Sequence, residues 1–202
     1  MTFLPRFLMK VIIEHLDPKV FHWSLLEYKH ISEVLGKENV TFTNIKTGRE
    51  KLEGLGEIKE ESVRDMKLEK VCILDPFAKE CLSKDDSFDC FVFGGVLGNE
   101  PMDRRTEKEI SNFFPDAEKR HLGKKQMSTD TAVIVCKKIV DDKLSFDDLE
   151  FIDEPEIKLD EGFSDILPYR YLKVDGEIML PDGLLEYLKD EDKYIEEEEL
   201  GL

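Results

Sequence analysis

Glycine residues follow a run of apolar residues in the segment FVFGGVLGNEP, which spans residues 91–101. Gly94, Gly95 and Gly98 have no side chains, so the backbone around them can approach a ligand closely. Their offsets differ from those of the dinucleotide-binding pattern GxGxxG, and the segment lacks the Lys-Ser/Thr pair of a phosphate-binding P-loop. The segment therefore predicts a tight turn that faces a ligand other than a dinucleotide or a nucleoside triphosphate.

Two other segments carry turn-forming or polar residues beside predicted strands. LDP (74–76) ends an apolar run, and LGKKQMSTDTA (122–132) follows a weaker strand and opens a helix. Ligands of open α/β sheets bind beyond the carboxyl ends of the strands, so we expect the three segments to form one composite pocket.

The elements that must position these segments follow from the apolar pattern. The runs KVCILD (70–75) and FDCFVFGG (88–95) lack polar alternation, which indicates strands covered on both faces, as in a parallel α/β sheet. The β-branched run at 129–140 suits a strand, but its length and its Thr-Asp start favour a helix. We expect further strands at 9–16, 40–43 and 117–122, and one short helix within 44–67.

Two other helices are predicted from their end signals. Asp17 and Pro18 are typical of a helix start, and apolar residues spaced by three and four lead from there to Gly36. Thr106 and Glu109 have the spacing of a capping box, for a helix that must end before Pro115.

The acidity of the chain is concentrated in its last part. The net charge is −17, and residues 145–202 hold 20 acidic and 5 basic side chains, a net of −15. This part has short alternating segments, a hairpin signal at Asp175-Gly176 and a last helix at 181–188. We predict an N-terminal extension (1–8), an α/β domain (9–144) and a small acidic α+β subdomain (145–202) with a flexible tail from about residue 190. The acidic surface either serves solubility or docks a basic partner, and it would repel RNA.

Several classes of protein are not supported by the sequence. There is no apolar run of about 18 residues, and MTFLPRFLMK lacks the features of a signal peptide, so we expect no membrane association. The four cysteines form no CxxC pair and are interpreted as reduced thiols in or near the core, which favours a cytoplasmic location. The four histidines show no metal-ligand spacing, and we expect no metal and a surface or half-buried place for each: His15, His22, His30 and His121.

The segments FVFGGVLGNEPMDRRT and RHLGKKQMSTDTA resemble the paired motifs of one branch of the SPOUT superfamily of S-adenosylmethionine (SAM)-dependent methyltransferases. That branch, first catalogued as RNA methyltransferases, includes a eukaryotic enzyme that methylates an arginine of a small-subunit ribosomal protein. The likeness extends from MKVIIEHL through LLEY, CILDP, FIDEPE and LPYRYL to LPDGLLEYL. It implies a mostly parallel sheet with a deep trefoil knot in the C-terminal part of the α/β domain.

The resemblance also implies a bound SAM, released as S-adenosylhomocysteine (SAH). The knot loops would hold it in a bent conformation. The residues implied to surround it are Leu74, Asp75, Pro76, Gly94, Gly95, Val96, Leu97, Gly98, Leu122, Gly123, Gln126, Met127, Ser128, Thr129 and Thr131.

An arginine substrate would set specific demands on the catalytic residues. A guanidinium keeps its proton at neutral pH, so carboxylates must hold it and accept a proton during attack. Glu100, Asp103 and Asp130 are the acids nearest the predicted pocket; Glu100 is the first choice, followed by Asp130. Arg105 or Arg104 would contact the cofactor carboxylate or the substrate. Members of the branch carry an aspartate and a histidine where Asn99 and Glu100 stand here, which leaves the general base open.

Three functions are therefore considered. The favoured one is methylation of an arginine in a basic ribosomal protein, which suits the acidic C-terminal third. The second is RNA methylation, with KRHLGKK (119–125), Arg104 and Arg105 as the phosphate-binding patch. The third is a catalytically silent protein that binds the cofactor or assists ribosome assembly. The sequence leaves a monomer and a homodimer equally open.

Overall fold

The structure is a computed structural model that describes residues 9–96, 103–160, 162–191 and 194–195. Its centre is a six-stranded sheet in the order β3-β2-β1-β5-β4-β6, and each of the five strand pairs is parallel. The predicted parallel α/β sheet is thereby confirmed. The trefoil knot stays a prediction. The strands are β1 (Val11–His15), β2 (Val40–Thr43), β3 (Glu57–Ile58), β4 (Val71–Leu74), β5 (Cys90–Gly95) and β6 (Glu118–Arg120).

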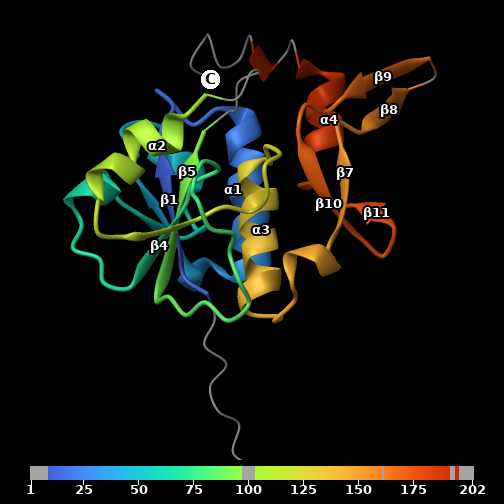
Figure 1. Cartoon of the computed structure of the whole chain (residues 1–202). Helices are drawn as coiled ribbons and strands as arrows, with labels where there is room; N and C mark the ends of the chain where they lie inside the picture. The colour runs from blue at the N-terminus through green and yellow to red at the C-terminus, as the bar shows by residue number, and fades with distance from the viewer. Residues whose placement is uncertain (1–8, 97–102, 161, 192–193, 196–202) are drawn as a thin grey trace, which may run out of the picture.

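Successive residues of the central strands face opposite sides of the sheet, and both sides are covered. Ile13 and Phe91 pack under α1 (His22–Leu35) and α3 (Thr129–Val140), which lie side by side on one face (Figure 1). Ile12 and Val92 join a second cluster on the other face, which Ile110 after α2 (Arg105–Glu109) helps to close. This double burial is the reason that the strand sequences are continuously apolar.

Two helix starts differ from the prediction. α1 begins at His22 rather than next to Asp17, because the Asp17 carboxylate accepts a hydrogen bond from the Arg105 guanidinium at 2.7 Å. Thr106 and Glu109 lie inside α2, whose N-cap is Arg104, so the predicted capping box is wrong. The ends near Gly36 and before Pro115, and the helix at 129–140, are confirmed.

The segment 44–67 is tied to the sheet by a buried carboxylate. Glu14 accepts hydrogen bonds from the hydroxyls of Thr43 and Ser62, both at 2.5 Å, and from the backbone N–H of Val63 at 2.9 Å. Instead of one short helix, the segment contains strand β3 and two 3-10 turns, η2 (Arg49–Leu52) and η3 (Val63–Asp65). The other 3-10 turns are η1 (Lys37–Asn39), η4 (Ser111–Phe113) and η5 (Phe146–Asp148).

The acidic C-terminal part forms two small antiparallel sheets and a helix. Asp175 and Gly176 both have positive φ, 53° and 85°, and connect β10 to β11, which confirms the predicted hairpin. The predicted last helix is also present, as α4. The elements are β7 (Glu150–Asp153), β8 (Glu156–Asp160), β9 (Phe163–Ile166), β10 (Arg170–Val174), β11 (Glu177–Ile178) and α4 (Leu184–Lys189).

The C-terminal part packs against α1 on the side away from the sheet (Figure 1). Leu26 of α1 shares an apolar cluster with Tyr171, Leu184 and Leu188. The backbone N–H of Arg170 donates to the carbonyl of Gln126 at 2.9 Å, so β10 is also joined to the segment before α3. The division at residue 145 stays a prediction. Within the described residues, no helix is long and apolar enough to cross a membrane.

The cysteines are distributed between the core and the surface. All four are free thiols: Cys72 and Cys136 are buried, Cys90 is half-buried and Cys81 is exposed. Burial raises the pKa of the Cys72 thiol to about 12 and that of Cys90 to about 11. These two side chains therefore stay protonated and belong to the core. Cys81 is exposed, whereas the sequence predicted a thiol in or near the core.

The close packing at the end of β5 generates a prediction. A Cβ at Gly95 would lie 2.2 Å from the Tyr28 hydroxyl and 2.7 Å from Cγ2 of Ile13, whereas one at Gly94 would meet Oγ1 of Thr106 at 3.0 Å. We expect Gly95→Ala to lower the free energy of unfolding by about 1–3 kcal/mol, the usual cost of overpacking. Gly94→Ala is the matched control and should cost less. Urea denaturation measures both, and equal stabilities would contradict the packing described.

Candidate functional site

A cavity opens at the carboxyl ends of β4 and β5, where the three predicted segments meet. The end of β4, the end of β5 and the segment that leads into α3 each contribute to its wall. The predicted residues that line it are Leu74, Asp75, Pro76, Gly94, Val96, Arg105, Leu122, Gly123, Gln126, Met127 and Thr129. The prediction missed other lining residues, among them Phe77, Phe93, Thr106, Arg120, His121, Lys125 and Ala132.

Other predicted residues have different places. Gly95 packs under the Tyr28 ring, and the hydroxyl of Ser128 donates to that of Thr131 at 2.8 Å at the start of α3. Asp130 is buried behind the cavity wall rather than on it. Leu97, Gly98 and Glu100 lie outside the described residues, so the first choice for the catalytic base stays a prediction.

Two glycines shape the cavity wall. A Cβ at Gly94 would lie 3.0 Å from Oγ1 of Thr106, and one at Gly123 would lie 2.8 Å from the Phe146 ring. Gly123 also has a φ of +84°, a conformation that residues with side chains rarely adopt. At both positions a side chain would press against a neighbouring residue, so glycine allows the close packing of the wall. The rest of the lining combines polar side chains such as Gln126 with apolar ones such as Met127 and Phe93.

The turn after β4 is held by the Asp75 carboxylate, which is buried. Its Oδ1 accepts from the backbone N–H of Phe77 at 2.9 Å, and its Oδ2 accepts from the hydroxyl of Ser111 at 2.6 Å. Both oxygens are therefore used within the fold. Asp75 orders the cavity wall and ties it to the turn after α2.

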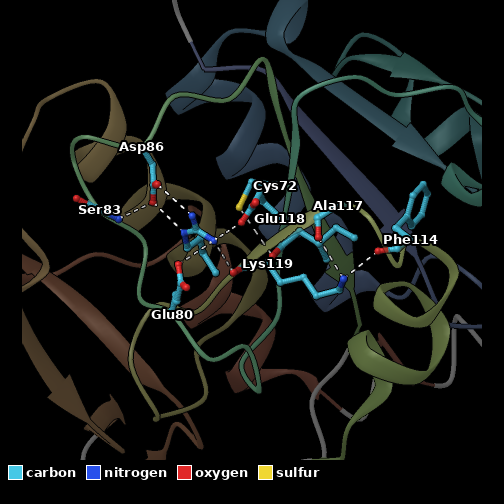
Figure 2. A network of polar contacts seen from close by, with 10 residues as sticks. Cys72, Glu80, Ser83, Asp86, Phe114, Ala117, Glu118 and Lys119 are labelled. Carbon is cyan, nitrogen blue, oxygen red and sulfur yellow. Dashed lines mark hydrogen bonds and ion pairs between the residues drawn. The ribbon is translucent and has the colours of Figure 1, made fainter.

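Arg120 lies at the end of β6 and anchors another part of the wall. Figure 2 labels its acidic partners Glu80, Asp86 and Glu118. Its Nε and Nη2 donate to both oxygens of Asp86, at 3.1 and 3.3 Å, and its Nη1 donates to Glu118 at 2.9 Å. The hydrogen bonds that Arg120 donates to Asp86 are the largest of the effects that raise the pKa of Arg120. The guanidinium is thus neutralised by neighbouring acids and holds the loop around residue 86 to the sheet.

The arginines beside α2 are paired in a similar way. Arg105 donates to Asp17 at 2.7 Å and to Glu109 at 2.9 Å. Arg104 pairs with Glu107 at 2.6 Å and stacks over the Phe77 ring, 4.4 Å from its centroid. Asp103, which also lines the cavity, pairs with Lys108, and that hydrogen bond lowers its pKa. Asp103 is therefore a weak proton acceptor.

A second polar group lies behind the cavity, between α1, α3 and β10. We call Trp23, Glu27, His30, Asp130 and Tyr171 the Glu27–Asp130 cluster. Glu27 accepts hydrogen bonds from the Trp23 indole N–H at 2.8 Å and from the backbone N–H of Thr129 at 3.2 Å. Oδ2 of Asp130 lies 2.7 Å from Nδ1 of His30. Both carboxylates are almost fully buried, with 4% and 1% of their residue surfaces exposed.

The cluster is electrostatically unusual. Burial raises the pKa of Glu27 well above its ordinary value, and the charge of Asp130 adds to the effect. Burial and then the charges of Glu27 and Asp130 raise the pKa of Tyr171. Among the described residues, no side chain or backbone group partners the Tyr171 hydroxyl or Oδ1 of Asp130. A buried polar atom without a hydrogen-bond partner lowers the stability of the fold, and a ligand that forms the missing hydrogen bond removes this cost.

Sequence reasoning missed most of this cluster. The expectation that every histidine lies at or near the surface is wrong for His15 and His30, which are both buried. Burial lowers the pKa of His15, whose Nδ1 contacts the Tyr28 hydroxyl at 2.8 Å. A signal was nevertheless present: Trp23, Glu27 and His30 recur at helical spacing, so a polar stripe runs along a helix that is otherwise buried. Among the described residues, no His, Cys, Asp and Glu side chains are grouped to hold a metal ion.

The raised pKa of Glu27 predicts how stability depends on pH. The folded protein keeps the Glu27 proton above pH 4.5, the ordinary pKa, whereas the unfolded chain loses it. Stability therefore falls as pH rises through this range, by at most about 1.4 kcal/mol per pH unit for one group. Glu27→Gln removes this loss, so the variant should gain stability relative to the wild type as the pH rises above 4.5. Urea denaturation at several pH values measures the difference.

Glu33→Gln is the control for that comparison, because Glu33 is exposed on the same helix. The difference in the free energy of unfolding between Glu33→Gln and the wild type should not change with pH. If the difference for Glu27→Gln is also independent of pH, then Glu27 titrates normally in the folded protein and the prediction is wrong.

Comparisons with known proteins agree with this geometry. Residues 10–195 match the family described as protein arginine N-methyltransferase SFM1-like. The chain is 37% identical over 202 residues to protein arginine N-methyltransferase SFM1 of Saccharomyces cerevisiae, covering 90% of this chain and 94% of that protein.

Solved structures give the same result. The yeast SFM1 structure complexed with SAM superposes with a TM-score of 0.83 at 34% identity, covering 92% of each chain. The complex with SAH gives 0.82 at 34% identity, with 91% of this chain and 96% of that one covered. Trm10 of Thermococcus kodakaraensis shares the fold, with a TM-score of 0.59 at 16% identity over 69% of this chain and 96% of that one. The resemblance seen in the paired motifs is thus confirmed, and the chain belongs to the SFM1-like family of protein arginine N-methyltransferases.

Proposed function

We propose that this protein transfers a methyl group from SAM to an arginine side chain of a basic protein and releases SAH. The observation that carries the proposal is the cavity formed by residues 74–76, 94–96 and 122–129, in a chain 34% identical to yeast SFM1, whose structures hold SAM and SAH. Following the resemblance of the motifs, we propose a small-subunit ribosomal protein as the substrate. The four free thiols fit a reducing compartment, and we propose the cytoplasm.

The residues of the cavity fit the proposed cofactor. Its glycine positions allow close packing of the wall, and Leu122 and Met127 offer apolar surface beside the side-chain amide of Gln126. Such a mixture of apolar walls and few polar groups is typical of small-molecule sites. When bound, SAM supplies the methyl group on its sulfonium. The full set of predicted cofactor residues, including those outside the described ranges, remains our proposal for its site.

The chain must also hold the substrate and accept a proton. A guanidinium has a pKa above about 12, so the nitrogen that is methylated must give up a proton to a base. Asp130 follows Thr129, which lines the cavity, and its Oδ1 has no partner among the described residues. We propose Asp130 for this role and keep Glu100 as a second acid of the site. Arg105 is engaged by Asp17 and Glu109, so we propose that it orders the wall beside α2.

The charges favour a protein substrate over RNA. Arg104, Arg105 and Arg120, which the RNA hypothesis requires, each pair with acidic side chains. RNA binding draws its affinity from cations that are free to meet phosphates. The acidic residues of 145–202, with a net charge of −15, suit a cationic partner instead.

The position of the cofactor can be tested by narrowing the cavity at Gly94. Side chains at Gly94 would press on Thr106, which also lines the cavity, and on Leu16 and Ile110 behind it, so Gly94→Ala and Gly94→Val displace this wall and we expect a graded loss of SAM affinity that reaches at least tenfold for valine. Isothermal titration calorimetry measures the affinity, and urea denaturation corrects for any unfolded fraction. Equal SAM affinity in all three proteins would place the cofactor elsewhere.

The substrate class can be tested with a cell extract that lacks this protein. The purified protein and methyl-labelled SAM should label a basic protein, the label should survive RNase, and acid hydrolysis should release it as methylarginine. Label lost to RNase would support an RNA methyltransferase instead. Absence of label, with SAM binding intact, would support a protein without transferase activity.

A further inference from the structure

Two large apolar side chains of strand β9 face the solvent. Phe163 and Ile166 are 74% and 63% exposed, the highest values among the large apolar side chains of the described residues. β9 pairs with β8 alone among the described strands, so its outer edge carries no further strand there. Exposed apolar side chains on an open strand edge are typical of a surface that binds another chain.

The β8–β9 hairpin is held against the rest of the protein by its inner face. Ile157 of β8 packs on the apolar cluster that contains Leu26 of α1 and Leu184 of α4. The ammonium of Lys189 in α4 also lies 3.2 Å from a carboxylate oxygen of Asp160. The position of β9 is therefore set by the fold, so a partner that binds along it does not have to order it first.

The outer edge of β9 carries an acidic side chain. The N–H of Leu167 donates to the carbonyl of Pro155 at 3.1 Å, toward the β8 side. Since successive residues of an antiparallel strand alternate in direction, the N–H groups of Ser164 and Ile166 point to the outer edge. There, Oδ1 of Asp165 accepts from the N–H of Ile166 at 2.8 Å. A carboxylate thus lies along the edge that carries the two apolar side chains.

The charge of this region indicates which kind of partner fits. Residues 150–168 hold seven acidic side chains and one basic side chain. A second copy of this chain would bring the same acidic edge and would be repelled, as would the phosphates of RNA. An extended segment with cationic and apolar side chains matches both the charge and the exposed apolar surface.

The hairpin also lies toward the end of the molecule that holds the cavity. β8, β9 and α2 are all found toward the upper end of Figure 1, and Arg105 and Thr106 of α2 line the cavity. The apolar cluster beneath the hairpin includes Trp23 at the start of α1, which follows the carboxyl end of β1. A protein segment whose arginine enters the cavity can therefore continue toward β9.

We infer that the outer edge of β9 is the docking surface for an extended, basic segment of the protein substrate. The inference rests on the proposed function and extends it, because it assigns to β9 the recognition of substrate residues other than the reactive arginine. The segment pairs with the outer N–H of Ser164 and covers Phe163 and Ile166. Its cationic side chains meet Asp165. The surface touches no reacting atom, so it contributes to substrate binding and not to the chemical step.

Kinetics with small-subunit ribosomal proteins test the surface. These proteins are extracted with concentrated salt from ribosomes of a strain that lacks this protein. Phe163→Ser and Ile166→Ser should each raise the KM for the protein mixture about tenfold and leave kcat unchanged. Phe113→Ser is the matched control, because Phe113 is 54% exposed on η4, and it should keep the wild-type KM. An unchanged KM in both β9 variants would overturn the inference.

The charge of Asp165 provides a second test. Asp165→Asn keeps an oxygen that can accept from the N–H of Ile166 but removes the charge, and Asp165→Lys reverses the charge. The KM should rise in that order, and less so in concentrated salt, which screens exposed charges. Glu33→Lys makes the same charge change at an exposed position of α1 and should keep the wild-type KM. An equal KM in the two lysine variants would reject Asp165 as part of the surface.

Two substitutions of Ser164 test the backbone pairing. Ser164→Pro removes the outer N–H, and proline is tolerated on strand edges. Ser164→Ala keeps the N–H and, like the proline variant, loses the hydrogen bond from the Ser164 hydroxyl to Glu156. The KM should rise for Ser164→Pro and stay near the Ser164→Ala value otherwise. An equal KM in both variants would show that the segment does not pair with β9.

Other occupants of the surface predict different results. The SAM affinity of every variant, measured by calorimetry, should equal that of the wild type, which shows that the cofactor cavity is intact. Wild-type dimers that Phe163→Ser dissociates in sedimentation would identify a contact between two copies. A KM effect that disappears after RNase treatment would identify RNA as the occupant. Either result would overturn the inference.

Failure of the surface and failure of the proposed function give distinct outcomes. Methylarginine formed with the same kinetics by the wild type and by the β9 variants would reject the docking surface alone. Absence of methylarginine with the wild type, although SAM binds, would reject the proposed function.

Discussion

The parallel direction of all six strands is the constraint on which the rest of the structure depends. The chain can leave β1, β4, β5 and β6 only at one edge of the sheet, so loops far apart in the sequence meet there. The central pair β1 and β5 is closed by Gly95 under Tyr28, a contact that leaves no room for a Cβ. The same edge then holds Gly94 on one side and the start of α3 on the other.

Charge pairing divides this edge into two environments. Around the mouth of the cavity, arginines are bound by acids: Arg105 by Asp17 and Glu109, and Arg120 by Asp86. Behind it, Glu27 and Asp130 are buried with few donors. The arginines thus order the walls, while Oδ1 of Asp130 has no hydrogen-bond partner among the described residues. This division is consistent with a positively charged substrate and with the acidic C-terminal part.

The C-terminal part is more than a surface appendage. Tyr171 comes from β10, so the cluster is complete only when this part is packed on α1. The cluster joins residues that are about 30, 130 and 170 positions along the chain.

The sequence by itself determined the parallel sheet, most element positions, the hairpin at Asp175-Gly176 and the family. Those features depend on local signals: double-sided apolar strands, turn residues and two specific motifs. The start of α1 could not be predicted, because the Asp17 carboxylate binds Arg105, 88 positions away in the sequence, instead of capping the helix that follows it. Likewise, Gly94 and Gly95 are neighbours of the same type, and only the tertiary structure decided that one lines the cavity while the other packs under Tyr28. The tertiary structure also decided the raised pKa of Glu27, because its burial and its nearness to the charge of Asp130 arise only when α1 and α3 pack together.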